Sequence, residues 1–315
     1  MNKTSRRLVA LVALAALLLG AGGAAAEPLR VEVSLKPVHA LVAGVMAGIA
    51  APGLIVTGSG SPHGYALRPS EARRIARADL IFWVSKDLER FLTKPFSTLK
   101  NQTTVIAVID LDELTRLPAR RGGVWAQDDH AHHRKDTAPA HRAFDSHVWL
   151  DPANAQIIAR AAARALAAAD PANRETYAAN AARLDVRLGA LDAELKARLA
   201  PVAALPYVVF HDAYQYFERR YGLRAIGAVS VGPGRQPGAR RFREIRARLR
   251  ETGARCLFRE PQFEPALAHT LVAGTGVRIG ILDPLGADLA PGPEAYFTLM
   301  RRLADGLRDC LAAAD

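Results

Sequence analysis

Residues 170–199 read DPANRETYAANAARLDVRLGALDAELKARL, and this stretch decides the architecture that we predict. Its apolar residues recur at steps of three or four, so they fall on one face of a helix. They are Tyr177, Ala181, Leu184, Leu188, Leu191, Leu195 and Leu199. At the rise of an α-helix the stretch is roughly 40 Å long, which exceeds one small domain. We therefore predict a linker helix over residues 170–199 that joins two lobes.

On both sides of this helix, short β-rich segments alternate with helical ones. Such alternation is typical of parallel sheets with helices on their faces. The predicted fold class is therefore α/β, with a mainly parallel sheet flanked by helices in each of two lobes, residues 27–169 and 200–315. The expected strands are residues 29–35, 54–57, 80–84 and 103–109 in the first lobe, and 207–210, 255–258 and 277–282 in the second.

Residues 1–26 have the pattern of a cleavable signal peptide. A basic start precedes an apolar run from Leu8 to Leu19, and three alanines at 24–26 fit a cleavage site. The run is shorter than the roughly 20 residues of a membrane span. A retained membrane anchor is the alternative interpretation. No cysteine stands near residue 27 to carry a lipid, so we expect a secreted protein that diffuses freely in the periplasm.

Charge argues against a nucleic-acid-binding function, and the two cysteines predict a disulfide. Removal of the three basic residues in the leader lowers the formal net charge from +11 to +8. Much of the excess is arginine within residues 240–250, spread over several helix faces, which favours a solvated surface over a nucleic-acid groove. In an oxidising compartment Cys256 and Cys310 predict a disulfide, with two buried thiols as the alternative. We expect a monomer with no nucleic-acid partner.

Four candidate metal ligands follow strands or open a helix. His63, His211 and Asp283 come after expected strands, and His147 directly precedes a helix. Ligands bind at the carboxyl ends of strands in open α/β sheets, and two of these residues belong to each lobe. Three imidazoles and a carboxylate form a tetrahedral set that suits Zn²⁺. Taken singly, a histidine in such a loop is more often an ordinary surface residue or a hydrogen-bonded buried one than a metal ligand.

A resemblance to a known family rests on short sequence motifs around these residues, which span nearly the whole chain. They are SPHGYALRPS (61–70), ADLIFWV (78–84), SHVWLDP (146–152), FHDAYQYF (210–217), FREPQF (258–263) and LDPLG (282–286). In this order they resemble the motifs of ABC-transporter metal-binding proteins of the ZnuA-type zinc-uptake family. The resemblance implies two α/β lobes bridged by a long helix, with one metal ion between them. It also implies delivery of that ion to an inner-membrane ABC permease.

The resemblance further implies that His63, His147 and His211 are ligands. Manganese-type relatives typically carry glutamate at the third position, so His211 favours zinc. Some zinc members place an acidic residue before the first histidine, where this chain has Pro62. The fourth position then falls to Asp283, which we favour, to water, or to Glu260.

Residues 115–146 form a stretch without periodicity that contains further histidines. They are His130, His132, His133 and His141. This loop is interpreted either as an auxiliary metal-collecting site or as a solvated linker.

Two other functions compete with zinc uptake. One is a manganese- or iron-binding member of the same family. The other is a zinc hydrolase, but the sequence has neither an HExxH pattern nor a GxSxG nucleophile elbow. We therefore expect a binding protein rather than an enzyme.

Overall fold

Two parallel sheets of four strands each form the frame of the molecule. The computed structural model describes residues 27–58, 60–99, 102–120, 144–230 and 239–313. The first sheet has the order β2-β1-β3-β4, and the second has the order β6-β5-β7-β8. All neighbouring strands pair in parallel. The predicted fold class is confirmed.

The first sheet is built from β1 (Val31–Val33), β2 (Gly53–Leu54), β3 (Leu80–Trp83) and β4 (Thr104–Ala107). Its helices are α2 (Lys36–Val45), α3 (Pro69–Ile75) and α4 (Arg90–Phe96). Strand β3 is largely buried, as expected for a parallel strand that is covered on both faces.

The second sheet contains one strand that the sequence did not predict. Its strands are β5 (Tyr207–His211), β6 (Ala225–Ser230), β7 (Cys256–Arg259) and β8 (Arg278–Ile281), and its helices are α7 (Gln215–Tyr221), α8 (Ala239–Glu251), α9 (Pro265–Val272) and α10 (Ala295–Leu311). The unexpected strand, β6, reads AIGAVS, and alanine and glycine are poor strand formers. Pairing with β5 supplies the stability that local propensity lacks.

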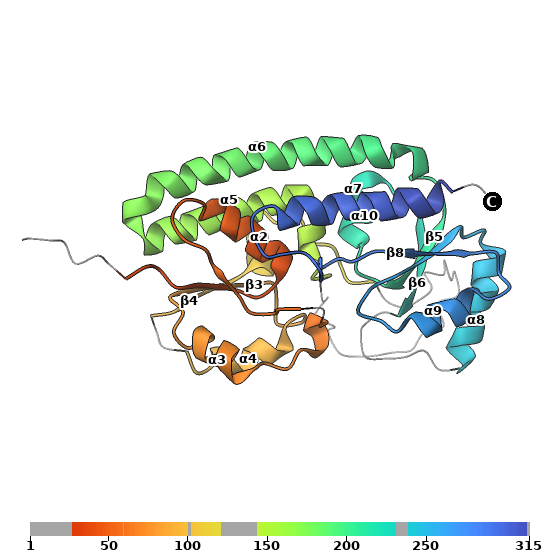
Figure 1. Ribbon diagram of the computed structural model, residues 1–315, viewed down its shortest axis with the longest axis horizontal. Coiled ribbons are helices and arrows are strands. Elements are labelled where there is room, and N and C mark those ends of the chain that lie inside the picture. The colour runs from red at the N-terminus through yellow and green to blue at the C-terminus, as the bar shows by residue number, and fades with distance from the viewer. Residues whose placement is uncertain (1–26, 59, 100–101, 121–143, 231–238, 314–315) are drawn as a thin grey trace, which may run out of the picture.

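A layer of long helices covers both sheets. Helix α5 spans Pro152–Ala169 and α6 spans Arg174–Leu199. Figure 1 shows α6 running along the length of the molecule, with α2, α5 and α10 packed beneath it. Every residue of the predicted apolar stripe of α6 is buried. The linker helix therefore joins the two sheets through one continuous core.

The start of this helix differs from the prediction. Residues Pro171–Asn173 form a 3₁₀ turn, and the α-helix begins only at Arg174. The carboxylate of Asp170 accepts hydrogen bonds from the Tyr177 hydroxyl, at 2.9 Å, and from the Asn173 amide, at 2.7 Å. Asp170 therefore holds the turn instead of capping an α-helix at residue 171.

The predicted disulfide is present. It joins Cys256, the first residue of β7, to Cys310 in the last turn of α10. The bond therefore ties the C-terminal helix to the second sheet. Within the described ranges, no helix is long and apolar enough to cross a bilayer.

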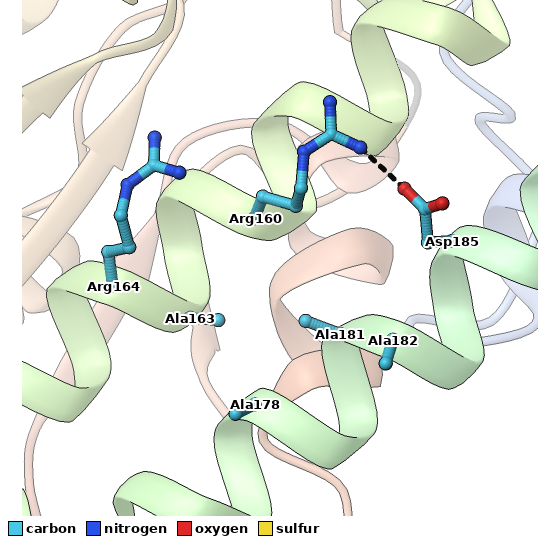
Figure 2. Close-up of a pocket in the computed structure, with 7 residues that line it drawn as sticks. All are labelled: Arg160, Ala163, Arg164, Ala178, Ala181, Ala182 and Asp185. Carbon is cyan, nitrogen blue, oxygen red and sulfur yellow. Dashed lines mark hydrogen bonds and ion pairs between the residues drawn. The ribbon is translucent and has the colours of Figure 1, made fainter.

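A groove of about 480 Å³ lies between α5 and α6 on the helical layer. Figure 2 shows the Arg160 guanidinium paired with the Asp185 carboxylate beside it. The other lining residues are Ala163, Arg164, Ala178, Ala181 and Ala182. None of the three candidate histidines lines this groove, so it is separate from the candidate metal site.

Candidate metal centre

Three of the predicted ligands meet between the two sheets. His63 lies in a 3₁₀ turn, Pro62–Gly64, that follows β2. His147 directly precedes the 3₁₀ turn Val148–Leu150 that leads into α5, and His211 is the last residue of β5. Each offers a ring nitrogen, and these three atoms lie within 4.8 Å of one another. Two lobes thus contribute to one group of imidazoles.

A carboxylate orients the ring of His147. Asp145 Oδ1 lies 2.7 Å from His147 Nδ1 and also accepts from the His147 backbone amide at 3.0 Å. An anionic acceptor at Nδ1 places the proton there and leaves Nε2 with its lone pair. The side chain of His147 is 8 % exposed. The only nitrogen of His147 left to ligate an ion is therefore Nε2.

His211 is oriented in the same way from the second lobe. Its Nδ1 lies 3.2 Å from Glu260 Oε1, and the Tyr214 hydroxyl donates to that oxygen at 3.3 Å. Burial acts to lower the pKa of His211, but the attraction and hydrogen bond of Glu260, together with the attraction of Asp212 and Asp145, outweigh burial and raise it. Glu260 therefore supports the third histidine, as a structural contact near the site.

His63 carries a buried nitrogen that has no partner. Among the described residues, no donor or acceptor reaches its Nε2. Burial is the largest cause that lowers the pKa of His63 to about 2, with added repulsion from His147 and His211. The ring is therefore neutral near pH 7, which is the form that ligates a metal. A buried ring nitrogen without a hydrogen bond fits a position where a metal ion binds.

The electrostatic surroundings favour a cation. Asp212 follows His211, and Arg120 Nη1 lies 3.1 Å from Asp212 Oδ1. The same guanidinium reaches Glu218 Oε2 at 2.7 Å, and burial raises the pKa of Glu218 to about 7. Arg120 offsets the charge of these two carboxyl groups. The negative charge beside the imidazoles is therefore that of Asp145 next to His147 and of Glu260 next to His211, and a divalent ion would offset it.

Asp283 is not a member of the histidine group. Its Oδ1 accepts hydrogen bonds from Gln262 Nε2 and from the Leu285 amide, both at 3.0 Å. Its Oδ2 accepts from the Ala287 amide at 2.5 Å. Three donors hold this carboxylate in the turn that follows β8, so the structure does not bring the favoured fourth ligand to the three imidazoles.

Comparison with known proteins decides the family. The family model described as "ZnuA: Zinc-uptake complex component A periplasmic" matches residues 31–310. The chain belongs to this family. It is 42 % identical over 311 residues to the high-affinity zinc uptake system protein ZnuA of Brucella suis, covering 91 % of this chain and 93 % of that protein. It is 38 % identical to the protein of the same name from Paracoccus denitrificans, covering 96 % and 98 %.

Solved structures show the same fold as this ZnuA-family chain. A crystal structure of ZnuA superposes with a TM-score of 0.75 at 23 % identity, covering 90 % of this chain and 100 % of that one. The solute-binding protein FpvC from Pseudomonas aeruginosa, solved with Mn²⁺, has a TM-score of 0.76 at 22 % identity, covering 91 % and 99 %. At these identities the similarity concerns the fold alone.

One predicted set of residues in this ZnuA-family chain stays untested, and the structure adds one residue that was not predicted. The auxiliary histidines, His130, His132, His133 and His141, lie outside the described residues. The sequence did not predict a role for Asp145, although it stands only two residues before His147. A carboxylate at this spacing indicates a supporting residue, because it can accept hydrogen bonds from both the backbone amide and the ring of the same histidine.

Proposed function

We propose that this chain binds one Zn²⁺ between its two lobes and delivers it to an inner-membrane ABC permease. The ligands are Nε2 of His63, His147 and His211. The observation that carries the proposal is the convergence of one ring nitrogen from each histidine within 4.8 Å, with Nδ1 of His147 and of His211 next to a carboxylate. Carboxylate–histidine pairs of this kind are usual around protein-bound zinc.

The donor set favours zinc over manganese. Imidazole nitrogen suits Zn²⁺, whereas Mn²⁺ prefers carboxylate, carbonyl and water oxygens. The fourth position is taken by water, because Asp283 is held by three hydrogen bonds and Glu260 is paired with His211. Competition between Zn²⁺ and Mn²⁺ for the purified protein tests this choice of metal.

Secretion and partnership complete the proposal. The family description places its members in the periplasm, and residues 1–26 have the pattern of a leader, although they lie outside the described residues. The protein works there as a monomer that captures zinc, docks on the permease and is not an enzyme. The zinc-loaded protein should therefore show no turnover of simple esters or phosphates in a hydrolysis assay.

Titration of single histidine variants tests the site. His63→Ala and His211→Ala are compared with His269→Ala, an exposed histidine of α9. Loss of a residue that only supports a ligand costs about 10–100-fold in metal affinity, so loss of a ligand should cost at least about 100-fold. The control should stay within about twofold. If neither His63→Ala nor His211→Ala loses tenfold, the site assignment is wrong.

A further inference from the structure

The segment that follows β8 connects the two lobes across the metal site. Residues 282–287, here called the crossover segment, leave the second sheet and contact the first lobe before the chain returns as α10. Figure 1 shows the chain passing from β8 toward α2 and then back along α10. Contacts on both sides hold this segment.

Two buried donors of the first lobe hold it from one side. Lys36, the first residue of α2, donates from Nζ to the carbonyls of Gly286 at 2.6 Å and Ala287 at 2.8 Å. Trp149 is fully buried and donates from Nε1 to the carbonyl of Pro284 at 2.9 Å. A buried ammonium at a helix N-terminus is unfavourable, because both burial and the helix dipole oppose it. The hydrogen bonds from the Lys36 ammonium to these two carbonyls offset the cost of burying it.

The shape of the crossover segment is itself closely held. Asp283 accepts the backbone amides of Leu285 and Ala287 across the turn. Gly286 adopts a φ of +63°, in the left-handed region that favours glycine, and a Cβ there would lie 2.7 Å from Leu289. The carbonyls that Lys36 and Trp149 contact therefore have little freedom to move.

The same segment is linked to the support of one ligand from each lobe. In the first lobe the Trp149 ring lies 5.3 Å from the His147 ring, centroid to centroid. In the second lobe the Tyr214 hydroxyl lies within hydrogen-bond distance of the Leu282 carbonyl, at 3.2 Å, and of Glu260, which holds His211. A shift of the crossover segment would therefore change the spacing between His147 and His211.

We infer that Lys36 and Trp149 are positioning residues that hold the two lobes at the separation that the three imidazoles need for a metal ion. They touch no ion and act through the crossover segment. The inference rests on the proposed function and adds which contacts control the release of zinc. Because zinc must leave by losing ligands from one lobe, loosening this contact raises the rate of zinc dissociation more than it changes the rate of binding.

Two substitutions test the inference in the full-length protein. Trp149→Phe removes the indole N–H and keeps an aromatic ring, and Lys36→Met removes the ammonium and keeps an apolar stem. The control is Tyr177→Phe, which removes a hydroxyl that donates to Asp170 on the helical layer. Zinc dissociation is followed by stopped flow with excess chelator, and unfolding is followed by circular dichroism.

The expected result is a dissociation rate about tenfold higher for Trp149→Phe and for Lys36→Met, the lower end of the effect of residues that orient metal ligands. Tyr177→Phe should release zinc at the rate of the unmodified protein. A merely structural role would lower the unfolding temperature of Trp149→Phe and leave its dissociation rate unchanged, which overturns the inference. If Lys36→Met does not fold, Trp149→Phe alone decides.

The two failures are distinguishable. If the unmodified protein binds no zinc, the proposed function fails and the inference with it. If the unmodified protein binds zinc and both variants release it at an unchanged rate, only the inference fails.

Discussion

The carboxylate behind His147 offers the sharpest test of how the metal site works. Asp145 Oδ1 accepts from both Nδ1 and the backbone amide of His147. Asp145→Asn keeps an oxygen acceptor of the same shape but removes the charge. Asp145→Ala removes both. A graded loss of zinc affinity is therefore expected, with the alanine variant weaker than the asparagine variant.

The magnitude follows from the two contacts. A charged acceptor forms a hydrogen bond roughly twice as strong as a neutral one, so asparagine should retain about half of the interaction. Full loss of a group that orients a metal ligand costs about 10–100-fold in affinity. We expect about tenfold for Asp145→Asn, or about 1.4 kcal/mol, and about 100-fold for Asp145→Ala, or about 2.7 kcal/mol.

The assay is competition titration with a chromophoric zinc chelator at pH 7.5. The matched control is Asp170→Asn, which alters a carboxylate that accepts two hydrogen bonds, from the side chains of Asn173 and Tyr177, but lies in the turn before α6. The control should bind zinc as the unmodified protein does. The reasoning is refuted if Asp145→Ala binds zinc as tightly as the control, because the carboxylate would then have no part in orienting His147.

Three further outcomes follow from the structure. Because burial lowers the pKa of His63 to about 2, this ring is already neutral at pH 5. The NMR signals of the His63 ring in the zinc-free protein, assigned by their loss in His63→Ala, should therefore not shift between pH 7 and pH 5, and a titration of these signals in that range would show that His63 takes up a proton there. Reduction of Cys256–Cys310 opens a loop of 54 residues and should lower the free energy of unfolding by about 4 kcal/mol. Because the bond lies at the opposite end of β7 from the site, zinc affinity should stay within about twofold, as titration after reduction would show. Burial raises the pKa of Glu89 to about 7, so the folded state binds the proton more tightly than the unfolded chain. The stability that this proton contributes is present below about pH 4.5 and is lost as the pH rises to about 7; denaturant unfolding of Glu89→Gln should show a weaker loss over this range than the unmodified protein, and an identical pH dependence would contradict the assignment.

Much of the architecture is present in local sequence patterns. The buried stripe of α6 is spaced at three and four residues, and this spacing alone predicts which face of the helix is buried. The strand end that carries His211 is equally predictable, because the apolar run of residues 207–210 ends where this histidine stands. Strand β6 was missed because its pairing with β5, a contact distant in sequence, stabilises residues of low strand propensity.

The roles of the carboxylates were decided only by tertiary structure. Asp283 and Glu260 both follow strands of the second lobe, and sequence position alone does not tell a ligand from a supporting residue. In the folded chain Glu260 lies against His211. Asp283 instead holds the turn after β8, and Lys36 and Trp149 donate hydrogen bonds to backbone carbonyls of that turn. A carboxylate acts according to the donors within about 3 Å of it, and the packing of the two lobes brings those donors from residues far away in the sequence.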